Sequence, residues 1–155
     1  MASYHFHLTQ VKRSRGQSVI AQAAYRAGEK LYSTYFGESS DFTRKRGVVM
    51  AEICLPDHAP REYADRETLW NALEWAETGR KAQLAHSFDI TLMNEFSMEE
   101  NIEMARTFVR EELVSRGMIA DFAIHDKGDG NPHAHILLTM RAMDEHGKWL
   151  PKSRK

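Results

Sequence analysis

Three histidines near the end of the chain have a spacing that could hold a metal ion. His133 and His135 lie two residues apart in an apolar segment that is expected to be a strand, so both side chains leave the same face. His125 ends the preceding apolar segment, and residues 126–132 contain glycines, an asparagine and a proline, which favour a turn. If the two segments pair as an antiparallel hairpin, His125 lies beside His133. Three neutral imidazoles that leave a coordination position open suit a catalytic divalent metal.

The competing interpretation is that these histidines are unrelated, and a His-x-His pair alone would favour it. A third histidine across a tight hairpin favours a shared metal site instead, because pairing of the two strands would itself bring the imidazoles together. His5 and His7 form a second pair on one face of an expected N-terminal strand. If that strand adjoins the one with His133 and His135, His5 or His7 borders the metal. Otherwise they are polar positions in a half-exposed strand.

A metal site of this kind serves either a water molecule or a side-chain nucleophile. The candidate nucleophile is Tyr25, in an alanine-rich segment whose small side chains would let a bulky substrate approach closely. Tyr32 and Tyr35 follow on what is expected to be the same helix. Taken alone, Tyr25 is better explained as an ordinary half-buried aromatic residue.

The elements that must position these residues can be read from hydrophobic periodicity. Ser97 with Glu100 predicts a capping box at a helix start, and Gly117 is a plausible end for that helix. The expected strands are 3–9, 47–55, the later half of 82–93, 119–125 and 133–140, and the expected helices are 17–35, 66–78 and 97–117. This order predicts an α+β fold: a five-stranded antiparallel sheet covered on one face by helices, of ferredoxin-like character.

The chain has 155 residues, of which 42% are hydrophobic and 28% charged, as in one soluble globular domain. The single cysteine, Cys54, excludes an internal disulfide framework, is expected in the core and fits a reducing cytoplasm. No apolar stretch approaches the ~18 residues that cross a bilayer, and no signal peptide is evident, so no membrane insertion is expected. The charged last residues, 151–155, suggest a domain (1–155) cut from a longer protein.

A net charge of −1 argues against a general polyanion binder, but the charge is unevenly distributed. Residues 1–50 carry eight Lys and Arg against three Asp and Glu, whereas residues 51–147 carry nine against nineteen. Basic clusters therefore flank the segment that contains Tyr25, and a local basic patch is what binding of a phosphate backbone requires. The clustered residues include Arg13, Arg15, Arg44, Lys45 and Arg46.

Two motifs together resemble the relaxase domain of the MobA/MobL mobilisation proteins. They are Gln17-Ser-Val-Ile-Ala-Gln-Ala-Ala-Tyr25-Arg-Ala-Gly28 and Asn131-Pro-His133-Ala-His135. The resemblance extends over essentially the whole chain, including 41–49 and 84–92. This family belongs to the HUH endonucleases, in which two histidines flank a hydrophobic residue, here Ala134, on a central strand.

The resemblance implies an enzyme that nicks one DNA strand at a plasmid or integrative-element origin of transfer. Tyr25 would attack the scissile phosphate, leave a 5′-phosphotyrosine link and a free 3′-hydroxyl, and later rejoin the strand. His125, His133 and His135 would hold Mn²⁺ or Mg²⁺, with Zn²⁺ as an alternative. A free tyrosine has a pKa of about 10, so it needs help from the metal or a base.

Further expectations follow from the same resemblance. Asp89 is a candidate to receive a ligand's free N–H, although a solvent-facing role is about as plausible; Ser87 and His86 depart from the residues expected beside it. His5 is a second candidate near the metal. Contacts with DNA phosphates are assigned to Arg13, Arg15, Arg26, Arg44, Lys45 and Arg46. The expected setting is the bacterial cytoplasm, with single-stranded origin DNA, accessory mobilisation proteins and a coupling protein as partners.

Two other functions fit part of the pattern. A replication initiator or single-strand transposase shares the HUH core but commonly places its tyrosine after the histidine pair, and the early position of Tyr25 counts against it. A DNA-binding module with a structural or vestigial metal would bind DNA without cleaving it. The presence of all three histidines and the tyrosine makes this second alternative the weaker one.

Overall fold

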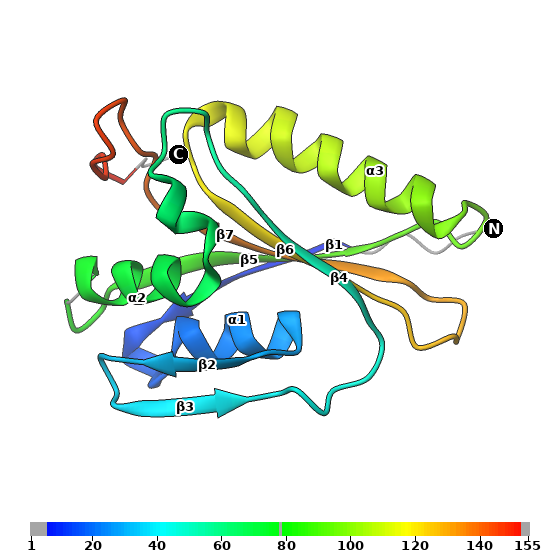
Figure 1. Cartoon of the computed structure of the whole chain (residues 1–155), viewed down its shortest axis with the longest axis horizontal. Coiled ribbons are helices and arrows are strands. Elements are labelled where there is room, and N and C mark those ends of the chain that lie inside the picture. Colours follow the sequence, from blue (N-terminus) through cyan, green and yellow to red (C-terminus); the bar gives the residue numbers. More distant parts are fainter. Residues whose placement is uncertain (1–5, 78, 153–155) are drawn as a thin grey trace.

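The computed structural model describes residues 6–77 and 79–152, and its centre is a five-stranded antiparallel sheet (Figure 1). The strands are β1 (Phe6–Lys12), β4 (Val48–Cys54), β5 (Gln83–Thr91), β6 (Ala120–His125) and β7 (His133–Thr139). Their order across the sheet is β1-β5-β7-β6-β4, so β7 is the central strand. The predicted α+β class and the five strands of this sheet are confirmed. His5 lies outside the described residues.

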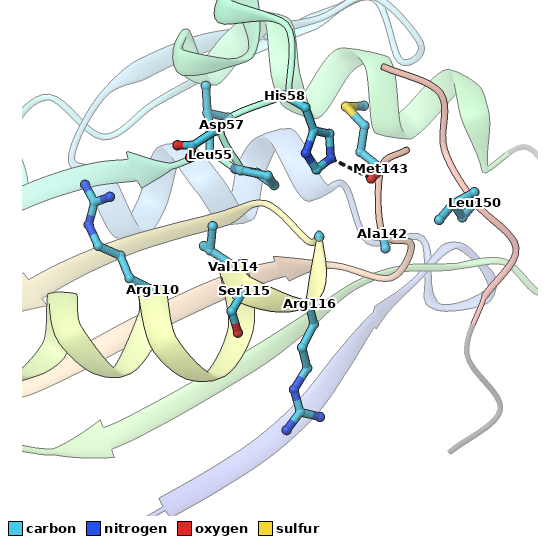
Figure 2. A pocket seen from close by; sticks show the side chains of 12 residues that line it. Leu55, Asp57, His58, Arg110, Val114, Ser115, Arg116, Ala142, Met143 and Leu150 are labelled. Atoms are coloured by element: carbon cyan, nitrogen blue, oxygen red, sulfur yellow. Dashed lines mark hydrogen bonds between the residues drawn. The ribbon is translucent and has the colours of Figure 1, made fainter. Parts of the chain in front are cut away.

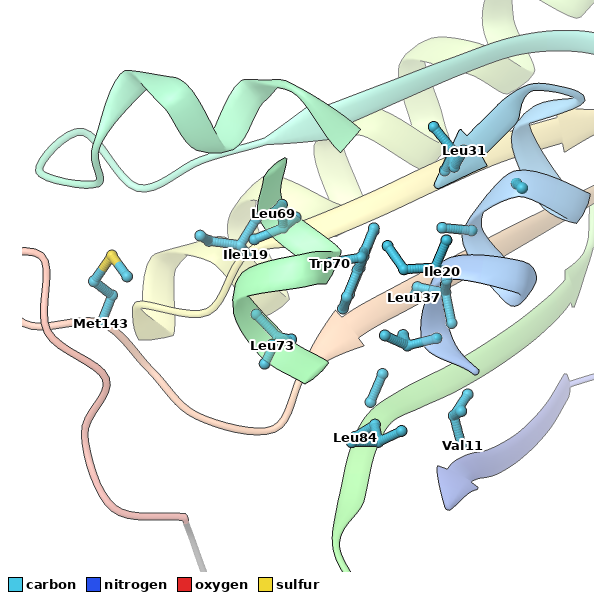
Figure 3. Close-up of a cluster of buried hydrophobic side chains, with 14 of the residues drawn as sticks. Val11, Ile20, Leu31, Leu69, Trp70, Leu73, Leu84, Ile119, Leu137 and Met143 are labelled. Carbon is cyan, nitrogen blue, oxygen red and sulfur yellow. The ribbon is translucent and has the colours of Figure 1, made fainter. Parts of the chain in front are cut away.

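Helices cover both faces of the sheet, so the prediction of one covered face was wrong. Figure 1 shows α1 (Val19–Ala27) and α2 (Arg66–Ala76) on one side and α3 (Met98–Phe108) on the other. The reason lies in the central strands: β6 is buried at every position, so both of its faces need a cover. Figure 3 shows the core on the α1–α2 side, where Ile20, Trp70 and Leu137 pack together. Phe122, Ala134 and Ile136 form the second core, beneath α3.

The first helix ends earlier than the alanine-rich pattern predicts. Ser18 caps α1 by accepting a hydrogen bond from Ala21 N, and Gly28 ends it with φ +68°, a left-handed conformation that favours glycine. The next residues form a separate hairpin, β2 (Lys30–Ser33) and β3 (Glu38–Asp41). Tyr32 therefore lies on a strand and Tyr35 in the hairpin turn, so the expectation that they share the helix of Tyr25 was wrong.

The other helices agree with the sequence. Asp65 caps α2 through Thr68 N, and Ser97 and Glu100 form the predicted capping box at the start of α3. After α3 the chain continues through a π turn (Val109–Leu113) and a 3-10 turn (Val114–Arg116). Gly117, with φ +94°, then ends the helical region where predicted. Short 3-10 turns also occupy Arg13–Arg15 and Arg61–Ala64. Among the described residues, no helix is long and apolar enough to cross a bilayer.

A buried polar centre joins α2 to the sheet. Asp121, on β6, accepts two hydrogen bonds from Arg66, at 2.8 and 2.9 Å, and one from Trp70 Nε1 at 2.9 Å. Arg66 uses its remaining Nη1 to bind Glu29 at 3.0 Å. Every polar atom of the Asp121 carboxylate thus has a partner, which is what a fully buried charge requires.

Candidate functional site

The three predicted histidines meet at one end of the central strands. His125 on β6 stands directly opposite His133 on β7, as the expected hairpin requires. The ring centroids of His125 and His135 are 4.3 Å apart, and those of His133 and His135 are 6.1 Å apart. Ala134, between the two β7 histidines, points into the core under α3, so both imidazoles leave the opposite face. The predicted pairing of His125 with His133 is confirmed.

Two of the imidazoles are oriented by hydrogen bonds. His135 Nδ1 donates to Asp89 Oδ1 at 2.5 Å, and Asp89 occupies the position opposite His135 in the β5–β7 pairing. This bond places the proton on Nδ1 and leaves the Nε2 lone pair of His135 available. His125 Nε2 donates to the carbonyl oxygen of Arg26, at the end of α1, at 2.6 Å. Because a carbonyl only accepts, the free lone pair of His125 is on Nδ1.

Burial and neighbouring groups shift the pKa values of His125 and Asp89. Burial lowers the pKa of His125 to about 4, and the nearby charges of Lys45 and Arg26 act in the same direction. Burial is the largest single influence on Asp89 and acts to raise its pKa. The hydrogen bond from His135 and the nearby charges of His135, Arg26 and His7 together exceed it and hold that pKa below its usual value. At neutral pH His125 is therefore uncharged and Asp89 ionised, which is the state that metal ligation needs.

Tyr25 lies at the same place. Its side chain, 48% exposed on the last turn of α1, lines a cavity of about 250 Å³ together with all three histidines. Phe42 packs edge-on against its ring, with centroids 5.2 Å apart, and Lys45 Nζ lies 3.4 Å from the ring centroid. The small residues around Tyr25 have two roles: Ala23 and Ala24 are buried against the core, and Gly28 lets the chain turn away at once.

The donor set fits a divalent metal in composition but is not assembled into a finished metal site. Within residues 6–77 and 79–152, no group of three or more His, Cys, Asp and Glu side chains is placed to hold one ion. The orientation of His125 contributes to this, because its Nε2 faces Arg26 instead of the other two rings. The free Nε2 of His135 and Nδ1 of His125 are nevertheless borderline nitrogen donors of the kind that Mn²⁺ and Zn²⁺ accept. The ligand assignment stays a prediction.

The six basic residues predicted to contact DNA are dispersed. Only Lys45 lines the cavity. Arg26 turns its guanidinium away, binding Gln22 Oε1 and Ser87 Oγ, each at 2.5 Å. Arg13 lies beyond the other end of α1, where it donates to the carbonyls of Glu74 and Glu77. The remaining three are exposed: Arg15, Arg44 and Arg46.

Sequence reasoning missed three further residues of the cavity: Lys127, Asp129 and Asn131. They belong to the turn that joins the histidine strands, and its position between two candidate ligands was the signal that could have found them. Side chains shape this turn, because Asp126 accepts from Gly128 N at 2.8 Å and Asp129 accepts from Asn131 N at 3.1 Å.

A larger cavity, of about 540 Å³, lies at the opposite end of the sheet (Figure 2). His58 contacts the carbonyl oxygen of Met143 there, at 2.8 Å, and Arg110 and Arg116 contribute charge to its wall. Figure 2 shows the two arginine side chains pointing in different directions. None of the predicted site residues lines this cavity.

Comparison with known proteins shows the family of this chain. Residues 17–155, which include Tyr25 and all three histidines, match the MobA/MobL family. The chain belongs to the MobA/MobL family. Its predicted resemblance is thereby confirmed, and the match covers the elements that build the cavity, α1 and the β6–β7 hairpin.

Curated relatives match nearly the whole chain. It is 38% identical to the "Probable mobilization protein MobA" of Bifidobacterium longum over 96% of this chain and 27% of that protein. It is also 38% identical to the "Conjugal transfer protein TraA" of Agrobacterium fabrum, over 95% of this chain and 14% of that one. The chain thus spans about a quarter or less of the length of these relatives.

A solved structure has the same fold. It is titled "Molecular Basis of Vancomycin Resistance Transfer in Staphylococcus aureus", with a TM-score of 0.92 and 37% identity over 99% of this chain and 78% of that one. The antiparallel sheet with helices on both faces is therefore a fold that this chain shares with a solved structure at substantial sequence identity.

Proposed function

We propose that this chain is a relaxase of the HUH endonuclease type, which cuts one DNA strand at an origin of transfer and rejoins it. The observation that carries this proposal is that Tyr25 lines the same cavity as His125, His133 and His135. A nucleophile and a set of metal ligands reach this cavity from separate elements, α1 and the β6–β7 hairpin. Membership of a family whose members are named for mobilisation and conjugal transfer supports the same function.

The proposed reaction is a transesterification. The oxygen of Tyr25 attacks the scissile phosphorus, a Tyr–O–P bond forms, and the bond from phosphorus to the 3′ oxygen breaks. The phenol proton is released, and the 3′ oxygen leaves as a hydroxyl after taking up a proton. Because one phosphate ester replaces another, the 3′-hydroxyl can later attack the 5′-phosphotyrosine link and restore the strand without ATP.

His125, His133 and His135 are the residues that would hold the divalent cation, Mn²⁺ or Mg²⁺, with Zn²⁺ as an alternative. When bound, the cation would polarise the phosphate oxygens and stabilise charge in the displacement. Asp89 fixes the tautomer of His135, so that Nε2 is the nitrogen offered to the cavity. His125 would contribute its Nδ1, or would have to leave Arg26 to contribute Nε2.

Single-stranded origin DNA is the proposed substrate. Lys127 lines the cavity and offers positive charge for phosphate groups. Beyond the other end of α1, Arg13, Arg80 and Lys81 border a second, basic concavity beside Tyr35. We assign flanking DNA to this surface because basic groups beside an aromatic ring suit a nucleic-acid strand. Accessory mobilisation proteins and a coupling protein in the bacterial cytoplasm are the proposed further partners.

The test is formation of a covalent protein–DNA adduct. Labelled single-stranded oligonucleotides that cover the origin of transfer of the encoding element are incubated with the protein and Mn²⁺ or EDTA. A denaturing gel then separates the adduct. We expect an adduct with Mn²⁺, none with EDTA and none with Tyr25→Phe. Tyr32→Phe is the matched control, because Tyr32 is similarly exposed, at 44%, but does not line the cavity.

Other outcomes would assign a different function. Cleavage without an adduct would indicate a water nucleophile and a hydrolase. An adduct that survives Tyr25→Phe would move the nucleophile to another tyrosine. Binding with neither cleavage nor adduct would indicate a DNA-binding module and contradict the proposed reaction.

A further inference from the structure

We propose that Lys45 is a positioning residue for Tyr25: it holds the phenol over the histidine cavity and places a cation on the face of its ring. Lys45 Nζ lies 3.4 Å from the Tyr25 ring centroid and donates a hydrogen bond to the Tyr25 carbonyl oxygen at 2.9 Å. One ammonium group therefore binds both the backbone and the ring of the proposed nucleophile. Binding of a DNA phosphate alone would not require these two contacts between Lys45 and Tyr25.

The segment that carries Lys45 is itself fixed to the site from two sides. Phe42 N donates to the carbonyl oxygen of Glu29 at 3.1 Å, and Lys45 N donates to that of Phe42 at 3.0 Å, which turns the chain back over Tyr25. On the other side, Asp126 N donates to the carbonyl oxygen of Gly47 at 2.8 Å. The segment between β3 and β4 thus links the end of α1 to the turn after His125.

Gly28 makes this close approach feasible. A Cβ on Gly28 would lie 3.2 Å from the Val48 side chain and 3.7 Å from the Phe42 carbonyl oxygen. Because position 28 carries only hydrogen, residues 42–48 can lie directly against the end of α1. Phe42 then packs edge-on against the Tyr25 ring while Lys45 covers its face, so two contacts restrict the rotation of one side chain.

The charge of Lys45 suits the chemistry of a tyrosine that must both attack and leave. The ring acquires negative charge as the phenol loses its proton, and a cation over its face stabilises that charge. In rejoining, the bond from phosphorus to the tyrosine oxygen breaks and the same anion departs. Lys45 therefore assists both directions. Burial lowers the pKa of Lys45 to about 8, with Arg26 and Lys127 acting in the same direction, and the ammonium form still predominates at pH 7.

This inference rests on the proposed function, and the experiment separates the two. Single-turnover adduct formation at saturating DNA, rejoining of the isolated adduct and DNA affinity are measured for wild type, Lys45→Met and Lys45→Arg. Lys127→Met is the matched control, because it removes the same charge from the same cavity, and among the described residues Lys127 makes neither a hydrogen bond nor a cation–π interaction with Tyr25. Circular dichroism confirms that each variant is folded.

We expect Lys45→Met to slow adduct formation and rejoining about 10- to 100-fold while changing DNA affinity by less than about threefold. Lys45→Arg should recover most of the rate, because its cation can also stack on the ring. Lys127→Met should lower affinity instead. Equal losses of affinity in both Met variants, or a rate for Lys45→Met within twofold of wild type, would overturn the role of Lys45. A wild-type protein without any adduct would instead overturn the proposed reaction, and this role with it.

Discussion

Two carboxylates on the same face of the sheet show how differently this fold uses charge. Asp121 on β6 is 5% exposed and takes three hydrogen bonds from Arg66 and Trp70, all from α2. Asp89 on β5 has a side chain 35% exposed and takes one from His135, a neighbour in the sheet. Helices seal the first carboxylate inside the protein. The second lies where α1 ends, and its partner borders a cavity.

The difference follows from where the helices stop. Apolar residues of β5 and β7, such as Ala85 and Leu137, occupy the part of the face that α1 and α2 cover. Towards the other end the same two strands carry Asp89, His135 and His133, and α1 ends above them at Ala27. One part of the face therefore stabilises the protein, whereas the other keeps polar groups accessible. Helical cover thus separates a carboxylate that is held inside the fold from one that stays accessible beside the cavity.

The largest effect on stability should come from Asp121→Asn. The substitution leaves the Arg66 guanidinium buried beside a neutral amide, so we expect the free energy of unfolding to fall by about 3 kcal/mol. This is the lower end of the range for a broken buried ion pair, because Glu29 still binds Arg66. Urea unfolding followed by circular dichroism measures it. Adding Arg66→Met should recover part of the loss. A change below about 1 kcal/mol in the single variant would show that the sealed pair does not stabilise the fold.

Asp89→Asn should change stability little and activity strongly. The amide oxygen can still accept from His135, so the free energy of unfolding should change by about 1 kcal/mol or less. The lost charge should lower metal affinity or adduct formation about 10- to 100-fold. Ser87→Ala is the matched control, because Ser87 lies on the same strand and face but binds Arg26. Equal activity losses in Asp89→Asn and Ser87→Ala would show that Asp89 has no specific role in activity.

A smaller effect distinguishes the two ends of α1. Gly16 and Gly28 both have φ +68°, but a Cβ on Gly16 would meet nothing within 4 Å, whereas one on Gly28 would press on Val48. Alanine should cost each variant about 1–2 kcal/mol of backbone strain. Only Gly28→Ala should also slow adduct formation, by displacing the segment that carries Lys45. Equal rates in the two variants would show that the site tolerates movement there.

The sequence predicted the pairing of the histidine strands better than the path of the chain after α1. A two-residue spacing and a turn-forming loop were enough to bring His125 beside His133, because strand alternation and hairpin pairing are local rules. The β2–β3 hairpin was missed because Leu31 follows Ala27 by four residues, a spacing that continues the helical pattern. The alternating burial that marks β2 as a strand, with Leu31 and Ser33 buried, is seen only in the folded structure.

Long-range partners could not be predicted in the same way. Asp121 and Arg66 are 55 residues apart, and nothing near either one indicates the other. The same holds for Lys45 and Tyr25, whose contact depends on how the segment between β3 and β4 lies against α1. The bond between His125 and the Arg26 carbonyl oxygen is likewise a tertiary contact. The sequence singled out Tyr25, Lys45 and His125 but could not indicate which residues they contact.

If the exposed part of the sheet face that carries His133 and His135 is a metal site, the protein must bind Mn²⁺, and this binding can be measured directly. Isothermal titration and electron paramagnetic resonance should give one Mn²⁺ per chain for wild type, with and without a single-stranded origin oligonucleotide. A His133→Ala, His135→Ala double variant should lose that ion. His58→Ala, in the cavity at the opposite end of the sheet, should keep it. Failure of the wild-type protein to bind Mn²⁺, or unchanged binding in the double variant, would contradict the assignment of these histidines as metal ligands.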